Sequence, residues 1–149
     1  MLDWLLNEPL NVGEAAPEFA LSGHGGETVR LSALRGKNVV LVFYPGDDTP
    51  TCTKQLCALR DEWPNLEAHN TVAFGINPRR AQSHAKFAAK FALPFPLLVD
   101  EGGRVAKLYH AGGLLVRRTV YGIDTDGVIR YARRGNPTPA EVLAAFSRP

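Results

Sequence analysis

Residues 38–57 of the chain read NVVLVFYPGDDTPTCTKQLC, and this single stretch contains both cysteines of the protein. Its first part, Asn38–Tyr44, is a continuous run of apolar, β-branched and aromatic residues, which is typical of a buried β-strand. Downstream, Leu56–His69 predicts a helix that Pro64 kinks or splits. The two thiols are therefore expected at a strand-to-helix junction, near the N-terminus of a helix.

This position favours thiol chemistry. Unpaired backbone N–H groups and the helix dipole stabilise negative charge at a helix N-terminus, and the thiolate is the reactive form of cysteine. Cys52 is the better placed of the two, since Cys57 lies a turn and a half further into the helix. On an unbroken helix, residues five apart have Cα atoms about 8 to 9 Å apart. A disulfide requires Cα atoms within about 7 Å, so a bond between these cysteines would require the first turns of the helix to unwind.

Outside this stretch, apolar runs and turn residues predict an alternation of strands and helices. Phe19–Leu21 and Thr28–Leu31 predict a hairpin, as do Thr119–Ile123 and Val128–Ala132. The other expected elements are strands at Thr71–Asn77 and Leu97–Val99, and helices at Ala81–Phe91 (with Ser83, His84 and Lys86 outward), Arg104–Tyr109 and Pro139–Phe146. This order predicts an α/β, thioredoxin-like fold in one domain over residues 1–149, with an N-terminal β-hairpin extension and a central mixed sheet flanked by helices.

The composition is that of an ordinary globular protein and argues against several functions. Apolar residues make up 45% and charged residues 21% of the 149 residues, which suits one domain with a full-sized core. The formal net charge is only +2 and the arginine pairs are scattered, so nucleic-acid binding is not expected. No segment approaches the ~18 to 20 consecutive apolar residues of a membrane span. Met1–Leu10 lacks the pattern of an export signal, so the expected compartment is the cytoplasm.

In the cytoplasm, closely spaced cysteines are more often catalytic or metal-binding than structural. A four-ligand zinc site is not expected, because no cluster of histidine or carboxylate side chains accompanies the cysteines. The four histidines have no ligand or catalytic-base spacing, and all are expected at the surface: His24, His69, His84 and His110.

Pro45, Thr49 and Cys52 fit the pattern P-x-x-x-T-x-x-C, which resembles the signature of the peroxiredoxins. The second cysteine five residues further on, followed by Leu59-Arg60-Asp61, is similar to the peroxiredoxin Q subgroup, also called bacterioferritin-comigratory protein. The resemblance extends along most of the chain, through Ala16–Phe19, Phe95–Asp100 and Arg118–Asp124.

The resemblance implies a role for each matching residue. Cys52 would be the peroxidatic thiol and Cys57 the resolving thiol, with Pro45, Thr49 and Arg118 completing the active site. Arg117 and Arg118 would point to opposite faces of a strand, and only the resemblance favours Arg118.

Two further residues, Tyr44 and Thr51, would line the substrate pocket, and Thr51 stands where the subgroup usually has glycine. The implied activity is reduction of hydrogen peroxide and organic hydroperoxides through a sulfenic acid on Cys52, which Cys57 converts to an intramolecular disulfide. Thioredoxin or a glutaredoxin-like dithiol protein would reduce that disulfide. No metal, flavin or haem cofactor is implied, and a monomer is expected because the resolving thiol lies in the same chain.

Two other functions are compatible with a redox-active cysteine pair. A thioredoxin-like disulfide reductase normally uses a C-x-x-C pair, and the four residues between Cys52 and Cys57 argue against it. A redox-sensing binding protein would expose apolar surface when the cysteines bond, and it would be supported by a long tail or a methionine-rich groove. The chain has one methionine.

Overall fold

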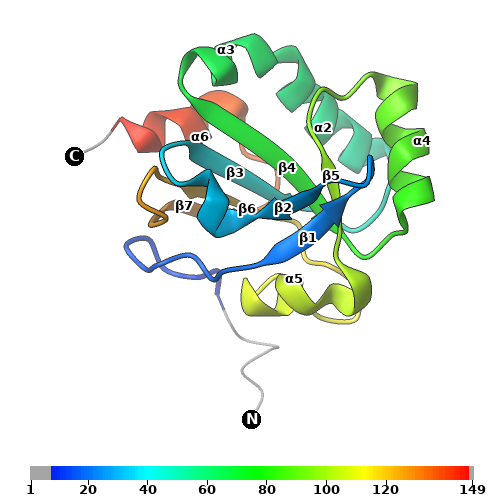
Figure 1. The fold of residues 1–149 in the computed structure, drawn as a ribbon, viewed down its shortest axis with the longest axis horizontal. Helices are drawn as coiled ribbons and strands as arrows, with labels where there is room; N and C mark the ends of the chain where they lie inside the picture. The colour runs from blue at the N-terminus through cyan, green and yellow to red at the C-terminus, as the bar shows by residue number, and fades with distance from the viewer. Residues whose placement is uncertain (1–7, 148–149) are drawn as a thin grey trace.

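The apolar runs of the sequence form one seven-stranded sheet in the computed structural model, which describes residues 8–147 (Figure 1). Most of Met1–Leu10, where no export signal was expected, lies outside the described residues. Side by side, the strands are β2 (Thr28–Arg30), β1 (Ala20–Gly23), β5 (Leu97–Val99), β4 (Thr71–Asn77), β3 (Asn38–Phe43), β6 (Thr119–Ile123) and β7 (Ile129–Arg134).

The centre of the sheet is parallel and its margins are antiparallel. Strand β4 runs parallel to both β3 and β5, and all other neighbouring strands are antiparallel. The helices and short 3₁₀ turns between the strands are η1 (Leu31–Leu34), α2 (Pro50–Asp61), α3 (Trp63–Ala68), α4 (Ala81–Phe91), η2 (Glu101–Gly103) and α5 (Arg104–Leu108), and α6 (Pro139–Phe146) follows the last strand. The predicted mixed sheet and thioredoxin-like layout are confirmed, and the N-terminal hairpin extends the sheet by pairing with β5.

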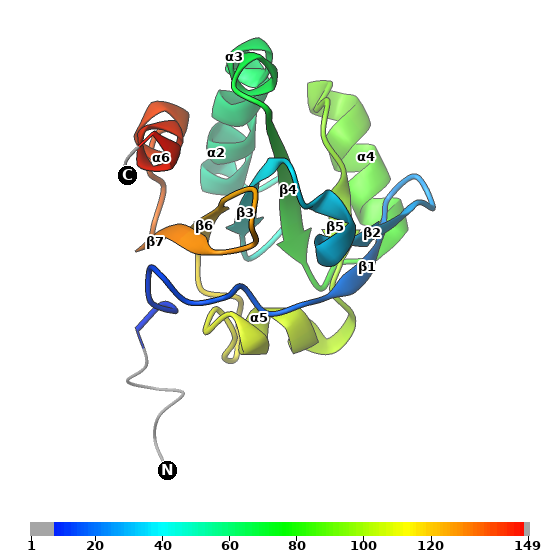
Figure 2. The same cartoon turned by 60° about the vertical axis from the view of Figure 1, so that its left-hand side comes forward.

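The two faces of the sheet carry separate hydrophobic cores. Along β3, Val39, Leu41 and Phe43 belong to the core on the side of α5, while Val40 and Val42 belong to the core on the side of α2. Figure 2 shows α2, α4 and α6 together on one side of the sheet and α5 on the other. Because β3 is covered on both faces, its sequence is a continuous apolar run without polar alternation.

The helix that carries the cysteines begins earlier than the sequence predicted. It starts at Pro50 instead of Leu56, because Thr49 has extended backbone angles and proline fits the first turn of a helix without losing a hydrogen bond. The expected split is confirmed, since α2 ends at Asp61 and α3 begins at Trp63 with Pro64 in its first turn. Both cysteines therefore lie inside one continuous helix.

Four strands and two helices differ slightly from their predicted limits. Strands β1, β2, β3 and β7 shift by one to two residues at one or both ends, and α3 and α5 end one residue early, at Ala68 and Leu108. The limits of β4, α4, β5, β6 and α6 are the predicted ones. Among the described residues, no helix has both the length and the apolar character needed to cross a membrane.

Candidate active site

The register of the central strands decides which side chains surround the loop after β3. Phe43, the last residue of β3, pairs with Ile76 on β4 and with Thr119 on β6. Asn77 and Arg118 therefore flank the segment 44–49, here called the active-site loop, which leads from β3 into α2. This loop lies at the carboxyl ends of parallel strands, where α/β proteins commonly bind ligands.

The Cys52 thiol is in contact with a guanidinium group. Arg118 donates from Nη2 to Cys52 Sγ at 3.1 Å and from Nη1 to Gln55 Oε1 at 2.7 Å. Cys52 is fully buried and lies in the first turn of α2, where helix N–H groups also favour negative charge. The guanidinium and the N–H groups of the helix terminus are therefore both placed beside the sulfur atom.

Gln55 is a residue that the sequence analysis missed. It follows Cys52 by three positions on α2, so both side chains lie on the same face of the helix. Its side chain is 3% exposed and also donates from Nε2 to Gly135 O at 3.4 Å. Gln55 therefore fixes the orientation of the guanidinium of Arg118 relative to Cys52.

The structure places Arg118, and not its neighbour, at Cys52. Strand β6 begins at Thr119, so Arg118 is the residue directly before the strand, level with the active-site loop. Arg117 instead donates its backbone N–H to Ala111 O at 2.7 Å.

The threonines and the proline of the motif surround the first turn of α2. Thr49 is the N-cap residue, but its side chain makes no capping hydrogen bond to the helix. Thr49 and Thr51 are exposed, and Pro45 is half-buried. The hydroxyl of Thr49 is therefore not committed to the helix end, unlike that of most N-cap threonines.

Tyr44 lies beneath the active-site loop, where it has no solvent-exposed surface. The sequence placed it in the substrate pocket, but its ring packs in the core below Cys52 and its hydroxyl donates to Asp47 Oδ1 at 2.7 Å. Gly75 on β4 makes room for the ring, because a Cβ there would lie 2.9 Å from Tyr44 Cε1 and 2.8 Å from Leu97 Cδ2. Burial, with the charge of Asp47, raises the pKa of Tyr44 well above its usual value, so its proton stays in place.

Both cysteines are free thiols, and they differ in exposure. Cys52 is buried, while Cys57 is half-buried and packs at the margin of the core between α2 and the sheet. Since α2 is continuous from Pro50 to Asp61, the two Cα atoms are about 8 to 9 Å apart by helix geometry. A disulfide cannot form until this part of the helix unwinds.

The active-site loop is held from below by a buried ion pair that the sequence did not predict. Asp47 Oδ2 lies 2.7 Å from His84 Nδ1 on α4, and the side chains are 4% and 0% exposed. Ser83 Oγ donates to the same carboxylate at 2.6 Å, and Asn77 Nδ2 donates to Asp47 Oδ1 at 3.2 Å. With Tyr44, these groups form what is here called the Asp47 clamp, which joins the loop to α4 and β4.

The prediction that His84 lies at the surface was wrong. Its ring is fully buried, and Nε2 lies 2.9 Å from Leu98 O on β5. Both ring nitrogens therefore have a hydrogen-bond partner, the Asp47 carboxylate at Nδ1 and a backbone carbonyl at Nε2. The other three histidines are half-buried or exposed. The sequence did not predict this burial, because the partner of His84, Asp47, lies 37 residues earlier in the chain.

The clamp makes stability depend on pH in a defined direction. Burial opposes ionisation of Asp47, but hydrogen bonds from His84, Ser83 and Tyr44 outweigh it and lower the pKa of Asp47. A carboxyl group whose pKa is lowered by folding stabilises the protein above its unfolded pKa of about 3.9, and that stabilisation is lost as pH falls through the folded value.

We expect the difference in free energy of unfolding between the wild type and Asp47→Asn to be constant near pH 7 and to shrink below about pH 4. Urea unfolding curves measured at intervals from pH 7 to pH 3 check this. A difference that stayed constant down to pH 3 would mean that Asp47 is not ionised in the clamp.

No group of three or more histidine, cysteine, aspartate or glutamate side chains within residues 8–147 is arranged to hold a metal ion.

The strand order and the loop geometry define the class of the protein. A thioredoxin-like sheet with a buried cysteine in the first turn of the helix that follows β3, next to an arginine directly before β6, is the peroxiredoxin type of architecture. The model of the AhpC/TSA family matches residues 12–132, and the chain belongs to this family.

Individual relatives confirm the resemblance to peroxiredoxin Q. The chloroplastic peroxiredoxin Q of Triticum aestivum is 44% identical over 123 residues, covering 80% of this chain and 57% of that protein. The putative peroxiredoxin bcp of Coxiella burnetii is 39% identical over 132 residues, covering 80% of this chain and 85% of that protein. The chain thus spans less than two thirds of the length of the wheat relative.

A solved structure agrees with the fold over nearly the whole chain. The crystal structure of peroxidoxin BcpB from Mycobacterium tuberculosis superposes with a TM-score of 0.85 and 32% sequence identity. The superposition covers 92% of this chain and 96% of that chain.

Proposed function

We propose that the protein is a thiol peroxidase that reduces hydrogen peroxide and organic hydroperoxides through two cysteines of one chain. The observation that carries this proposal is the contact of Arg118 with the buried thiol of Cys52 at the N-terminus of α2. A thiolate that is held beside a guanidinium in a site closed to bulk water is an activated nucleophile.

The first step forms one bond and breaks another. The Cys52 thiolate attacks one peroxide oxygen, so that an S–O bond forms while the O–O bond breaks and an alkoxide or hydroxide leaves with the electron pair. Negative charge moves from sulfur to oxygen, and the guanidinium of Arg118 is positioned to stabilise it throughout. The uncommitted hydroxyl of Thr49 can donate to the peroxide oxygens, and the leaving oxygen takes up a proton to give alcohol or water.

The second step uses Cys57. Its thiol attacks the sulfur of the Cys52 sulfenic acid, an S–S bond forms, the S–O bond breaks and water leaves. The N-terminal turns of α2 must unwind for this to happen, and the lack of a side-chain cap from Thr49 makes that end of the helix easier to open. A dithiol protein then supplies two electrons and two protons to restore both thiols.

Intact mass after one equivalent of hydrogen peroxide tests the cycle. The wild type is expected to lose two hydrogens and to give a peptide cross-linked between Cys52 and Cys57. Cys57→Ser is expected to keep the first turnover, to gain one oxygen, and to proceed to sulfinic acid with excess peroxide, because no second thiol of the chain remains. Full recycling of Cys57→Ser by a dithiol donor would contradict the resolving role.

Arg118→Lys is expected to lower the second-order rate constant with hydrogen peroxide by about 10²- to 10³-fold. An ammonium group cannot reproduce the two-pronged contact with Cys52 and Gln55, because it lacks the planar fork of guanidinium. Arg117→Lys is the matched control, since the same change one residue earlier leaves the contact with Cys52 intact. Stopped-flow kinetics of both variants, with circular dichroism to verify folding, give the comparison.

We also propose that thioredoxin or a glutaredoxin-like protein reduces the disulfide, and that the protein acts as a monomer in the cytoplasm. The closeness of the two cysteines within α2 supports resolution inside one chain. Peroxide-dependent NADPH oxidation coupled to thioredoxin and its reductase, compared with glutaredoxin and glutathione, identifies the donor. Sedimentation at several protein concentrations tests the monomer, and cell fractionation tests the compartment.

A further inference from the structure

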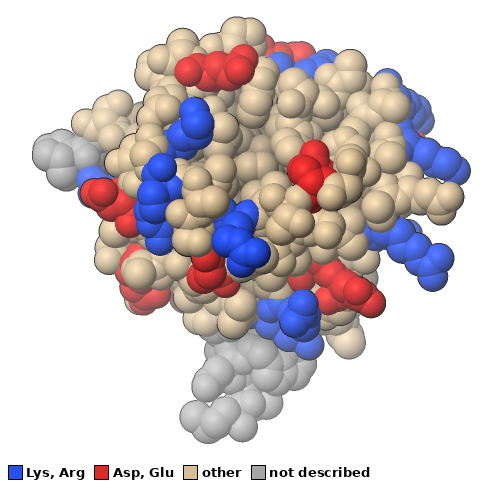
Figure 3. Space-filling model, viewed as in Figure 1, with Lys and Arg blue, Asp and Glu red and all other residues tan. Residues whose placement is uncertain are grey.

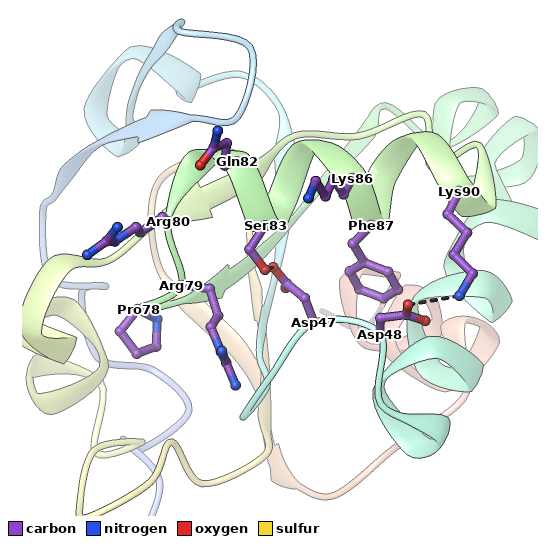
Figure 4. A pocket seen from close by; sticks show the side chains of 10 residues that line it. All are labelled: Asp47, Asp48, Pro78, Arg79, Arg80, Gln82, Ser83, Lys86, Phe87 and Lys90. Atoms are coloured by element: carbon purple, nitrogen blue, oxygen red, sulfur yellow. Dashed lines mark hydrogen bonds and ion pairs between the residues drawn. The ribbon is translucent and has the colours of Figure 1, made fainter.

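The polar contacts of Cys52 lie toward β6 and β7, on the side of the active-site loop away from α4 (Figure 2). On the α4 side, Figure 4 shows Asp47 and Asp48 turned toward the helix, where Asp48 pairs with Lys90 at 2.9 Å. Among residues 8–147, no hydrogen bond or ion pair joins a side chain of α4 to the sulfur of Cys52. Basic and acidic side chains are interspersed over the face shown in Figure 3, so no single charged patch of that face stands out. The positive charge in contact with the thiol is that of Arg118, and its placement depends on the groups that hold it.

Gln55, which holds the guanidinium, has two hydrogen-bond partners of opposite kinds. Its Oε1 accepts from Arg118 Nη1 at 2.7 Å, and its Nε2 donates to Gly135 O at 3.4 Å. A guanidinium can only donate and a backbone carbonyl can only accept, so a reversed amide would place donor against donor and acceptor against acceptor. A cavity of about 10 Å³ adjoins Gln55, and its other lining side chains are those of valine, leucine and proline, with room for one water molecule at most. The carbonyl of Gly135 therefore fixes which end of the amide faces Arg118.

Gly135 is attached to Arg118 a second time, through the backbone. It directly follows β7, and its N–H donates to Arg118 O at 2.9 Å, which extends the pairing of β7 with β6 by one hydrogen bond. One residue thus holds Arg118 at its main chain and, through Gln55, at its guanidinium. The two attachments leave from the N–H and the C=O of the same residue, so their relative direction depends on the backbone torsions of Gly135.

The backbone of Gly135 has a conformation that favours glycine. Its φ is +97°, in the left-handed region, where a residue with a Cβ is strained. Space is not the reason, because a Cβ at this position would meet no atom within 4 Å. A residue with a side chain would fit the surroundings but would shift φ, and the N–H and C=O would then not both keep their partners. Glycine is needed here for the torsion that aims the carbonyl at Gln55.

We propose that Gly135 is a positioning residue of the active site, which sets the guanidinium of Arg118 against Cys52 by way of Gln55. This inference rests on the proposed peroxidase function and adds a residue to the same site. In the proposed reaction, negative charge moves from sulfur to oxygen, and a guanidinium that is already oriented stabilises it without reorganisation. A displaced Gly135 carbonyl would let the amide of Gln55 rotate, and Arg118 would keep its charge but lose its fixed direction.

Gly135→Ala is expected to lower the second-order rate constant with hydrogen peroxide about tenfold, which corresponds to the loss of one hydrogen bond at the site. Gly36→Ala is the matched control. Gly36 has a φ of +94°, a Cβ there would also meet no atom within 4 Å, and it lies before β3, at the end of that strand remote from the active-site loop. Urea unfolding should show similar losses of stability for the two variants, and stopped-flow kinetics should show a loss of rate for Gly135→Ala alone. Gly135→Asn is expected to recover most of the rate, because asparagine adopts positive φ more readily than alanine.

A double-mutant cycle tests whether Gly135 acts through Gln55. In the background of Gln55→Met, which removes both amide contacts, Gly135→Ala is expected to change the rate constant by less than about twofold. The same tenfold loss in both backgrounds would overturn the proposed route. Equal rate constants of Gly135→Ala and Gly36→Ala would overturn the positioning role itself.

The side-chain amide signals of Gln55 in an NMR spectrum, assigned by their absence in Gln55→Met, report this geometry without any redox chemistry. In the reduced wild type, the Nε2 protons are expected to exchange slowly with solvent, because the group is buried and donates to Gly135 O. Gly135→Ala should shift these signals and speed their exchange, while Gly36→Ala should leave them unchanged. If this pattern is found but the wild type consumes no peroxide, the peroxidase function fails and the placement of Gln55 by Gly135 stands. If the wild type consumes peroxide but Gly135→Ala leaves the signals in place, the positioning role fails alone.

Discussion

Replacing Cys52 with serine is expected to remove peroxide consumption, lowering the rate constant by more than about 10³-fold, as loss of a catalytic nucleophile does in other enzymes. A hydroxyl group is not ionised near neutral pH, so the charge that Arg118 stabilises on sulfur is absent. The fold should be kept, because serine is close to cysteine in volume and can accept the hydrogen bond from Arg118. Stopped-flow measurement of hydrogen peroxide consumption gives the rate.

Cys57→Ser is the matched control for this variant. It makes the same atomic replacement five positions along α2, at the half-buried thiol, and keeps the first turnover. Circular dichroism and urea unfolding of both variants separate loss of chemistry from loss of structure. Peroxide consumption by Cys52→Ser at more than one tenth of the wild-type rate would remove Cys52 from the role of nucleophile.

Breaking the Asp47 clamp is expected to have the largest effect on stability. Asp47→Ala leaves the buried ring of His84 without its carboxylate partner, and removal of one partner of a buried pair of this kind typically costs about 3 to 5 kcal/mol in the free energy of unfolding. Ser83, Tyr44 and Asn77 also lose an acceptor. The peroxide rate constant should fall as well, because the active-site loop loses its attachment to α4.

Asp48→Ala provides the comparison within the same loop. Asp48 pairs with Lys90 at 2.9 Å, but both side chains are about half exposed, and exposed ion pairs contribute under ~1 kcal/mol. Urea unfolding of the two variants at pH 7 gives the two free energies. If both variants lost the same free energy of unfolding, the buried Asp47–His84 pair would contribute no more to stability than the exposed Asp48–Lys90 pair.

The strands and most helices could be predicted from the sequence because their signals are local. Residues 39–43 of β3 are an unbroken apolar run, and Pro139 marks the first turn of α6. The start of α2 could not be found in this way, because residues 50–55 show no apolar periodicity. The combination of Thr49 with Pro50 was the available signal, and it is the pattern of an N-cap followed by the first helical position.

The site was predicted only where a motif names its residues. Cys52 and Arg118 followed from the resemblance, and the pairing of Phe43 with Thr119 explains why Arg118 meets the thiol. Asp47 lies in the loop after β3, and His84 lies on α4, the helix that connects the parallel strands β4 and β5. The two residues are 37 positions apart, so no local sequence pattern predicts their contact. A polar side chain on an amphipathic helix is normally solvated, so the burial of His84 required knowledge of its partner.

Two attachments, the Asp47 clamp and a hydrogen bond of Arg60, limit the length of chain that would unwind in the proposed redox cycle. Asp47 fixes the chain just before α2, and Arg60 Nη1 donates to Phe91 O at 2.8 Å near the end of that helix. Between these points the backbone can lose its helical hydrogen bonds while the sheet and α4 keep theirs. The free energy of opening is therefore that of a small cooperative unit instead of the whole fold. In the cycle that we propose, the lifetime of this open unit, and not global stability, sets whether Cys57 or a second peroxide reaches the sulfenic acid first.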